Sequence, residues 1–439
     1  MGANTDDDGD REHRPGREYA RDRDRADPLA GFRDRFDVPD EHYMDGNSLG
    51  PISDAAERTL DRAVDQWREQ GIRSWTEGEE PWFWYGERLG DELASLVGAD
   101  ESEVMVGNST TVNIHTLIGT MLDRLAAQDP GDHRGVLVNE LDFPTDHYAI
   151  QSQLRARGLD PDEHLHLVES RDGRTIDTDD VVAAMDEHDV GIVFMPSVLY
   201  RSGQLFDVER ITEAAQERGI LAGFDLAHSI GAVPHELSAI GVDFAVWCSY
   251  KYLNAGPGSV AGLYVNERHF DATPALAGWW GHDKETQFEL NLEFTPADDA
   301  GAWQIGTVPV LSAAPLFGSV ELVHEAGIEA IREKSLGLTS YLIHQVDERL
   351  ADRGVSIGTP RQSDRRGGHV ALEHEEAMRI SEALRDRGIV VDFRPPNVIR
   401  VAPAPLYVGF EDVYAVVDAI CEIVDERTYE RYDAQGEVT

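Results

Sequence analysis

The sequence predicts an α/β protein with a mostly parallel central sheet, on three observations. The chain has 439 residues, 41% of them hydrophobic, which is enough for a large domain with a smaller one attached. Short apolar runs alternate with helical stretches between about residues 100 and 265, and strands separated by helices form βαβ units. Polar residues follow these runs, at the strand ends where open parallel sheets bind ligands.

The expected strands are short apolar runs that stop at polar or turn-forming residues. They are residues 104–106, 135–138, 165–168, 191–195, 221–224 and 244–247. Helices are expected to fill the intervals, as at residues 208–218. The alternation therefore predicts one continuous sheet with crossover helices.

The segments on either side of this sheet differ from it in composition. Residues 1–28 are rich in Asp, Arg and Glu and predict a disordered tail. Farther on, Ser53 is a plausible N-cap of a helix with Leu60, Val64 and Trp67 on one face. After the sheet, one long helix from Val310 to about residue 353 is expected to lead into a smaller unit. Its expected strands are residues 369–372 and 398–401.

The charge balance excludes some partners. There are 83 Asp and Glu residues against 39 Lys and Arg, a formal net charge of -44. Such a surface repels nucleic acid and anionic membranes. It indicates either a field that excludes acidic substrates or adaptation to high salt, where the Debye length falls to about 3 Å at 1 M. The even spread of the acids favours the salt interpretation, which predicts unfolding in dilute buffer.

Cysteine count and hydropathy predict a soluble, cytoplasmic protein. Cys248 and Cys421 are the two cysteines, so a disulfide scaffold is excluded and both thiols are expected to be reduced. No run approaches 18 apolar residues, and the N-terminus lacks an apolar signal region.

Two of the expected strands end in residues suited to an anion and to a flat ring. Residues 108–113 open a helix, where free backbone N–H groups and the hydroxyls of Thr110 and Thr111 form an anion site. The alternative is ordinary N-capping. In residues 139–146, Phe143 stands near Asp146 and could stack on a flat ring, although a turn with a buried phenylalanine is the alternative.

Two further strand ends carry a carboxylate and an amine. Asp225 could pair with a protonated pyridine nitrogen, with His228 three residues on, or it could cap a helix. Lys251, after Tyr250, follows an apolar strand, where a lysine is costly unless it is paired or used. Removal from water favours the neutral, nucleophilic form of an amine; a surface lysine with a buried stem is the alternative. Together the four segments predict a site for a phosphorylated pyridine aldehyde.

At these residues the sequence resembles the kynureninase family of fold type I enzymes that use pyridoxal 5'-phosphate (PLP). The resemblance covers residues 43–424. It is carried by the runs GNSLG at 46–50, FPTD at 143–146, GFDLAH at 223–228, WCSYKYLN at 247–254, GWWGH at 278–282 and IRVAP at 399–403. It implies an α/β, fold type I, PLP-dependent-transferase-like architecture: a large domain with a mostly parallel sheet of the seven-stranded type plus a smaller C-terminal α+β domain. With the sequence pattern it divides the chain into the tail (1–28), an N-terminal arm joining the small domain (29–75), the large PLP-binding domain (76–315) and the small C-terminal domain (316–439).

The resemblance also implies a role for each site residue. Lys251 carries PLP as a Schiff base, and Asp225 pairs with its ring nitrogen. The remaining cofactor residues implied are Thr110, Thr111, Phe143, Pro144, Thr145, Asp146, His228, Tyr250, Trp279 and Thr307, the last two reaching over from the partner subunit of a homodimer with shared sites. The substrate residues implied are Asn47, Gly306, His282 and Arg400, whose planar fork suits a carboxylate. His115, His147 and His282 lack metal-ligand spacing, so no metal is expected.

The implied reaction uses a small-molecule amino acid as its substrate. It is the hydrolysis of L-kynurenine, and possibly of its 3-hydroxy form, to anthranilate or 3-hydroxyanthranilate and L-alanine, in tryptophan catabolism or NAD precursor supply. Lys251 is implied to remove the α-proton and Tyr250 to relay protons. Gly306 resembles the bacterial type, which favours kynurenine over the 3-hydroxy form.

Other interpretations stay open. Another fold type I enzyme, a cysteine desulfurase or an aminotransferase, is one alternative; a desulfurase needs a mobile cysteine, whereas Cys421 lies in an apolar helical run. A non-catalytic PLP-binding protein is another. Pro196 stands where the family commonly has a small hydroxyl residue, and either Ser197 substitutes or the contact is lost. The aromatic run at 82–85 is expected in the core or at a dimer interface.

Overall fold

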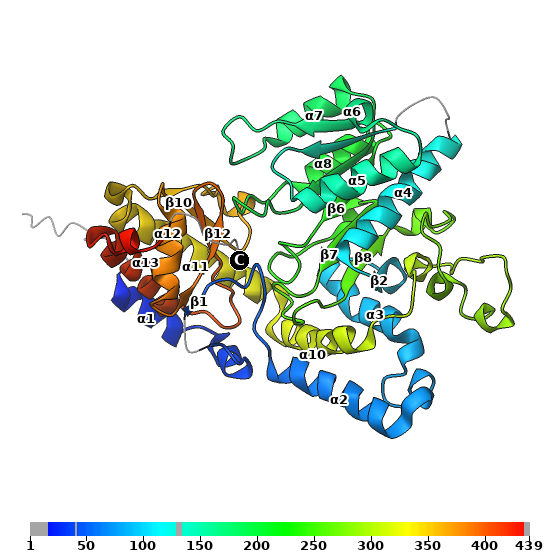
Figure 1. Cartoon of the computed structure of the whole chain (residues 1–439), viewed down its shortest axis with the longest axis horizontal. Helices are drawn as coiled ribbons and strands as arrows, with labels where there is room; N and C mark the ends of the chain where they lie inside the picture. The colour runs from blue at the N-terminus through cyan, green and yellow to red at the C-terminus, as the bar shows by residue number, and fades with distance from the viewer. Residues whose placement is uncertain (1–15, 40–41, 129–133, 434–439) are drawn as a thin grey trace, which may run out of the picture.

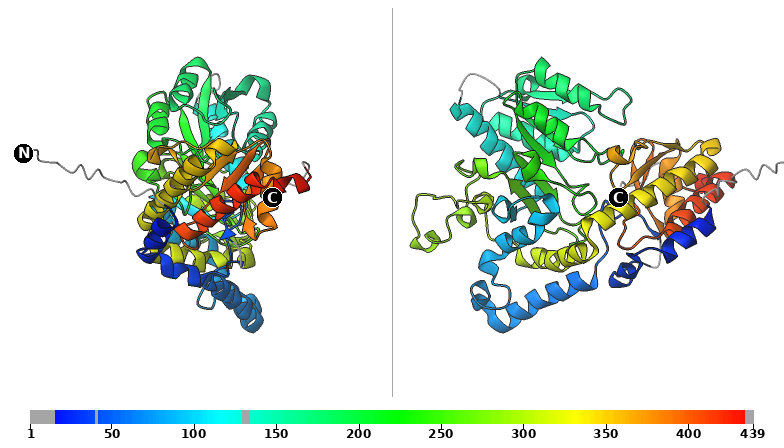
Figure 2. Two further views of the ribbon diagram at one scale, coloured as in Figure 1. Left: turned by 90° about the vertical axis from the view of Figure 1, so that its left-hand side faces the viewer. Right: turned by 180° about the vertical axis from the view of Figure 1, so that it is seen from behind.

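A computed structural model gives the fold of residues 16–39, 42–128 and 134–433. A large domain built on a seven-stranded sheet lies beside a smaller domain built on a four-stranded sheet (Figure 1). Seen from behind, α11 (Ile328–Arg349) leads from α10 (Val310–Ala326) into the smaller domain (Figure 2).

The large sheet has the strand order β2-β8-β7-β6-β5-β3-β4. The strands are β2 (Val104–Val106), β3 (Gly135–Asn139), β4 (Leu165–Val168), β5 (Val190–Pro196), β6 (Leu221–Asp225), β7 (Phe244–Cys248) and β8 (Ala261–Val265). Strands β4, β3, β5, β6 and β7 pair in parallel, and β8 runs antiparallel to both β7 and β2. The mostly parallel α/β sheet predicted from the sequence is therefore confirmed, and β8 is a strand that the apolar-run analysis missed.

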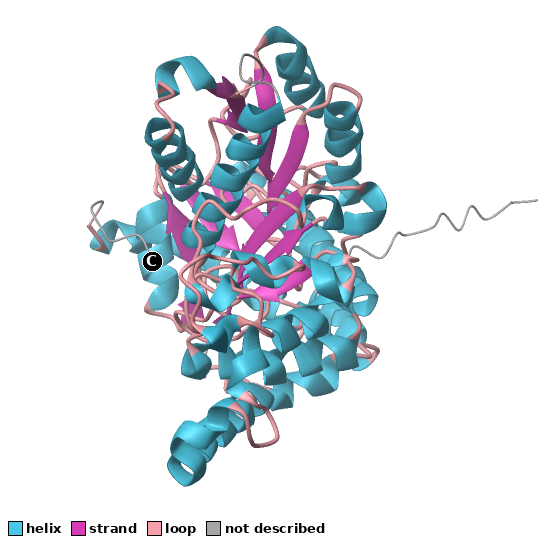
Figure 3. Ribbon diagram, turned by 90° about the vertical axis from the view of Figure 1, so that its right-hand side faces the viewer, coloured by secondary structure: helices cyan, strands magenta, loops and turns pink. Residues whose placement is uncertain are grey.

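Helices cover both faces of this sheet, so its central strands are apolar throughout rather than alternating (Figure 3). The helices are α3 (Tyr85–Val97), α4 (Thr110–Gln128), α5 (Pro144–Ala156), α6 (Pro161–His164), α7 (Thr178–Glu187), α8 (Val208–Gln216) and α9 (Leu237–Ile240). Turns of 3-10 helix are η1 (Ala30–Arg35), η2 (Gly71–Trp75), η3 (Trp82–Trp84), η4 (Glu101–Glu103), η5 (Glu267–His269), η6 (Trp279–Gly281), η7 (Gln287–Glu289), η8 (Ala300–Trp303), η9 (Ala351–Arg353), η10 (Ser363–Arg365) and η11 (Thr428–Arg431).

The smaller domain has an antiparallel sheet of order β12-β13-β10-β9. Its strands are β9 (Ser356–Ile357), β10 (Val370–Glu373), β12 (Asp392–Arg394) and β13 (Val398–Val401), packed with α11, α12 (Ala377–Arg385) and α13 (Phe410–Asp425). Strand β1 (His42–Tyr43) pairs in parallel with β11 (Ile389–Val390). The segment that follows β1 is thereby held against the smaller domain.

Two predictions about helices are corrected. The single long helix after Val310 is two helices, because Gly327 has φ +77° and ends α10. Ser53 does cap α2 (Asp54–Gln70), accepting from Ala56 N at 3.1 Å. The buried face of α2, however, consists of small residues that allow close packing on α10, and Trp67 is 58% exposed.

The prediction that residues 1–28 are disordered is wrong for residues 16–28. Residues Arg17–Arg25 form α1, which lies along α13. Asp24 accepts hydrogen bonds from the backbone N–H groups of Phe410 (2.6 Å) and Glu411 (2.9 Å) and so caps α13 from outside. Ion pairs and helix capping order this segment. The prediction of disorder relied on apolar content, which does not reveal such contacts. The rest of the predicted tail lies outside the described residues.

No helix in the described part of the chain is long and apolar enough to cross a membrane.

Candidate active site

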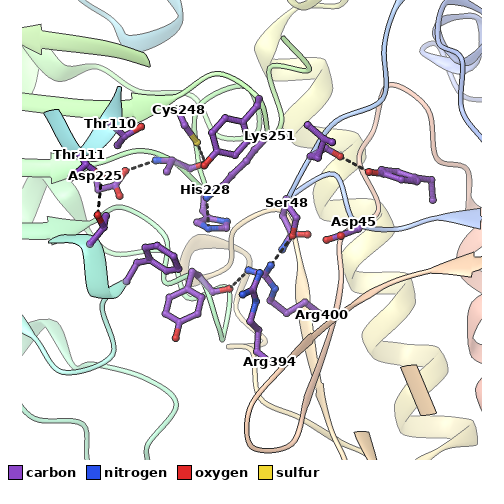
Figure 4. Close-up of a pocket in the computed structure, with 18 residues that line it drawn as sticks. Asp45, Ser48, Thr110, Thr111, Asp225, His228, Cys248, Lys251, Arg394 and Arg400 are labelled. Carbon is purple, nitrogen blue, oxygen red and sulfur yellow. Dashed lines mark hydrogen bonds between the residues drawn. The ribbon is translucent and has the colours of Figure 1, made fainter. Parts of the chain in front are cut away.

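A cavity of about 550 Å³ lies between the two domains, beyond the ends of β6 and β7. The residues that line it come from both domains and from the segment after β1. They are Tyr43, Asp45, Asn47, Ser48, Leu49, Thr110, Thr111, Phe143, Thr145, Tyr200, Asp225, Ala227, His228, Cys248, Tyr250, Lys251, Arg394 and Arg400. In Figure 4 the threonines and the arginines lie on opposite sides of the cavity, with Lys251 and His228 between them.

Lys251 reaches the cavity from the turn that follows β7. Its Nζ lies 2.8 Å from His228 Nε2. His228 is buried, and burial lowers its pKa well below the ordinary value, an effect that Lys251 and Arg400 reinforce. The imidazole is therefore neutral at pH 7 and can accept a hydrogen bond from the lysine. This contact fixes the amine at the centre of the cavity.

Asp225, the last residue of β6, turns its buried carboxyl toward the same cavity. Its Oδ1 accepts a hydrogen bond of 2.7 Å from Ala227 N, which fixes the side chain. Burial raises the pKa of Asp225, and the charge of Lys251 opposes that rise. A cationic ring nitrogen placed here would complete the pairing of this carboxylate.

The threonines at the other side form an anion site. Thr110 and Thr111 begin the 19-residue helix α4, whose first N–H groups lack intrahelical partners. Thr111 Oγ1 lies 2.8 Å from Thr145 Oγ1, at the start of α5. Two helix N-termini and three hydroxyls thus face the same part of the cavity, an arrangement suited to an anion.

Phe143 presents its ring at the cavity wall. The side chain is 45% exposed. Its ring meets that of Tyr200 edge-on, with centroids 5.3 Å apart and an interplanar angle of 84°. A flat ligand ring could cover the exposed area of Phe143.

Three buried carboxyls gather at this side of the cavity, and one of them, Asp225, lines it. Asp142 and Asp146 are buried next to Asp225. Burial, reinforced by the charge of Asp225, raises the pKa of Asp142 to about 8; burial and both neighbouring carboxyls raise that of Asp146 well above its ordinary range. Near pH 7 the cluster therefore holds protons that exposed carboxyls would have lost.

We expect Asp142→Asn to stabilise the protein at alkaline pH. The pKa of Asp142 is higher in the folded than in the unfolded protein. The stability that this carboxyl contributes is therefore fully present below about pH 4 and is lost as the pH rises through about 8. The amide cannot ionise and can still accept the hydrogen bond from Phe143 N, now 2.9 Å. Urea unfolding without added ligand should show a gain in stability for the variant that is about 1–3 kcal/mol larger at pH 8 than at pH 5. An equal difference at both pH values would contradict this titration.

Arg400 occupies the side of the cavity that belongs to the smaller domain. It is 1% exposed, and Asp392, also buried, holds its guanidinium from one side. Nη1 donates to Tyr200 O at 2.7 Å and Nη2 to Ser48 Oγ at 2.9 Å. Arg394 donates to the same Asp392 at 2.8 Å. Two guanidiniums and one hydroxyl thus converge where a ligand carboxylate would fit.

Two polar residues beside Arg400 add to this region. The Asn47 side chain is fully buried, and its amide has no hydrogen-bond partner among the described residues. Because such groups are costly to leave unpaired, Asn47 indicates a bound ligand. Burial raises the pKa of Asp45 to about 6, with Asp392 adding to the rise.

The structure brings most of the predicted site residues together. Ten line the cavity: Asn47, Thr110, Thr111, Phe143, Thr145, Asp225, His228, Tyr250, Lys251 and Arg400. Pro144 and Asp146 lie just behind the wall, in α5. Trp279, His282, Gly306 and Thr307 do not line it and lie on another part of the large domain. The structure therefore does not bring these four predicted residues together with the rest of the site.

Sequence reasoning missed several lining residues, namely Tyr43, Asp45, Ser48, Tyr200, Cys248 and Arg394. Cys248 and Ser48 stand within recognised runs and could have been found there. Ser197 does not take the place of the hydroxyl lost at Pro196, because its Oγ lies 2.6 Å from Ser229 Oγ in the core. Among the described residues no His, Cys, Asp or Glu cluster is arranged to hold a metal ion.

Comparison with known proteins identifies the family. The model of the kynureninase C-terminal domain matches residues 331–420. A kynureninase from Geobacillus thermodenitrificans is 51% identical over 425 residues, 97% of this chain and 98% of the relative. One from Bacillus anthracis is 49% identical with the same coverage. The chain belongs to the kynureninase family.

Solved structures agree on the fold. A cysteine desulfurase from Thermococcus onnurineus has a TM-score of 0.76 at 18% identity, covering 90% of this chain and 98% of that one. A C-DES variant with glycine covalently linked to its PLP cofactor has a TM-score of 0.73 at 15% identity, covering 88% and 98%. The fold type I prediction is confirmed. The desulfurase alternative is not favoured, since Cys421 is buried in α13.

The residues present fit PLP. The unpartnered N–H groups of α4 suit its phosphate, the buried Asp225 its ring nitrogen, and Lys251 its aldehyde carbon. The chain is therefore a PLP-dependent hydrolase of the kynureninase family, acting on a carbon–carbon bond.

Proposed function

We propose that the chain hydrolyses L-kynurenine to anthranilate and L-alanine in this cavity. The observation that carries the proposal is the placement of Lys251 between Asp225 and the buried Arg400. A reacting α-amino acid held by its carboxylate at Arg400 would present its α-carbon to the lysine amine. The proposal is supported by the identity to kynureninases, which spans nearly the whole chain.

The chain's own residues divide the work of proton movement. PLP, when bound, withdraws electrons from the substrate. Lys251 Nζ is placed to take the α-proton, with His228 Nε2 as its hydrogen-bond partner at 2.8 Å. Burial, helped by Cys248, raises the pKa of Tyr250, so the phenol stays protonated and serves as a proton donor. Arg400 and Ser48 hold the carboxylate and fix which bond faces the lysine.

The proposal is tested by adding L-kynurenine to purified protein in molar salt and following anthranilate fluorescence. Absorbance at about 420 nm reports the lysine-bound cofactor. Anthranilate release together with this band supports the proposal. Formation of the band without release of anthranilate would show that the protein binds PLP but catalyses another PLP-dependent reaction.

A homodimer with shared sites belongs to the same proposal. Trp279 is 50% exposed, and its ring centroid lies 5.7 Å from that of Phe288. Phe288, Leu290 and Leu292 in the following loop are more exposed still. Contiguous exposed apolar residues of this kind mark interaction surfaces. Because Trp279 and Thr307 lie outside the chain's own cavity, a second copy would use them to complete its phosphate site.

Substrate choice, pathway and location follow as finer proposals. A Cβ at Gly306 would meet nothing within 4 Å, so this position leaves room for a substrate ring in the partner's cavity. We expect kynurenine to be preferred over 3-hydroxykynurenine, and equal kcat/KM for both would contradict this. The products suit tryptophan catabolism and NAD precursor supply in the cytoplasm.

We expect the fold to depend on molar salt. The formal net charge of -44 gives strong self-repulsion in dilute buffer, which salt screens over about 3 Å at 1 M. Circular dichroism during dialysis from 2–3 M to about 0.1 M KCl should show loss of helix. Sucrose at matched water activity is the control, because it lacks ions. An unchanged spectrum at low salt would contradict the adaptation.

A further inference from the structure

Lys284, one of only three lysines in the sequence, is enclosed by aromatic rings away from the cavity. Its Nζ lies 4.4 Å from the ring centroid of Trp280, 4.6 Å from that of Phe83 and 5.7 Å from that of Trp84. The side chain is 7% exposed, and Glu87 Oε1 is 3.3 Å from the ammonium. Cation–π attraction strengthens when the cation is desolvated, so this cage holds a charge firmly.

The ammonium joins three segments of the chain. It donates to Phe83 O at 3.3 Å, at the turn before α3. Glu87 Oε1, its ion-pair partner in α3, also accepts from Gln304 Nε2 at 2.7 Å. Gln304 directly precedes the loop that carries Gly306 and Thr307. Lys284 itself belongs to the loop that follows Trp279 and His282.

The two loops also pack against each other through their backbones. A Cβ on Gly278 would lie 1.9 Å from Ile305 O, and one on Gly281 would lie 2.3 Å from Ala302 O. Inside the first loop, His282 Nδ1 accepts from Thr295 N and its Nε2 lies 3.2 Å from Thr286 Oγ1. These contacts hold the loop with Trp279 and the loop with Thr307 together as one packed unit, and Lys284 lies at its buried centre.

We propose that Lys284 is a positioning residue for the active site of a second copy of the chain. Its cage sets the placement of Trp279 and Thr307, which do not reach the cavity of their own chain. The proposal rests on the shared-site homodimer proposed above. It also assigns a role to Phe83 and Trp84 of the aromatic run at 82–85, which enclose the lysine.

The first test uses Lys284→Met, which keeps an unbranched side chain one atom shorter and removes the charge. We expect a PLP dissociation constant, measured by spectroscopic titration, about tenfold higher, and a kcat about tenfold lower, because small misplacements at a site are costly. Glu87→Gln weakens the same ion pair and should change the PLP dissociation constant and kcat in the same way. It replaces the first variant if Lys284→Met fails to fold. Lys284→Arg keeps the cation and should restore most of the cofactor affinity.

The second test uses heterodimers, made by co-expression with two different tags. Pairing a Lys284→Met chain with a Lys251→Ala chain leaves one complete site, built from Lys251 of the first and Trp279 and Thr307 of the second. About half of the wild-type activity is expected, since one of two sites is intact. A Trp279→Ala chain paired with the Lys251→Ala chain is the control and should give the same result.

The outcomes separate the two proposals. Activity in both heterodimers supports the role of Lys284 toward the partner. Activity with Trp279→Ala but none with Lys284→Met means that Lys284 acts only within its own chain, and overturns the inference. Inactivity of both heterodimers overturns the shared site itself. Normal cofactor affinity in the Lys284→Met and Glu87→Gln homodimers also overturns the inference.

Discussion

Lys251→Ala should lower kcat by about 10⁴-fold or more, since it removes both the amine that binds the cofactor and the base at the α-carbon. The absorbance band at about 420 nm should not form when PLP is added to this variant. Truncation also leaves His228 Nε2 without the partner that lies 2.8 Å away. Because the pKa of His228 is lowered by burial, the imidazole stays neutral and the site should not unfold.

The matched control for Lys251→Ala is Lys334→Arg. Lys334 is a buried lysine that pairs with Asp27 at 2.6 Å, in the smaller domain and away from the cavity. Arginine can keep that pair, so the control should retain the absorbance band and most of the activity. Circular dichroism should show that both variants fold. More than a tenth of wild-type kcat in Lys251→Ala would show that another group moves the α-proton.

The strand ends of the large domain could be predicted from the sequence because their chemistry is local. An apolar strand that stops at Asp225, or three residues before Lys251, places a polar group at the ligand-binding edge of the sheet, whatever the rest of the fold does. Asn47 and Arg400 came only through the family resemblance. They meet the cavity from segments about 350 residues apart, and no local pattern reports that meeting.

The features that the sequence did not predict share a physical cause. Helix α1 is ordered by carboxylate caps and ion pairs on α13, and the break at Gly327 depends on one glycine with positive φ. Asp45 and Arg394 join the site through the register of the smaller sheet and the pairing of β1. Each is a tertiary effect that composition and periodicity do not encode.

Arg400→Lys should raise KM for kynurenine by about 30- to 100-fold, roughly 2–3 kcal/mol. A guanidinium offers two parallel donors to a carboxylate, whereas an ammonium is a point charge. The lysine would still neutralise Asp392. It could not donate to both Tyr200 O and Ser48 Oγ, which now lie 2.7 and 2.9 Å from the Arg400 nitrogens. The carboxylate is bound alike before and during the reaction, so kcat should fall less than KM rises.

The matched control for Arg400→Lys is Arg394→Lys, the same exchange on the other guanidinium that contacts Asp392. Arg394 is the more exposed of the two, so its lysine variant should change KM by less than about fivefold. Steady-state kinetics at constant salt measures both. If KM rose in the Arg394→Lys variant and stayed unchanged in the Arg400→Lys variant, Arg394 rather than Arg400 would be the residue that binds the substrate carboxylate.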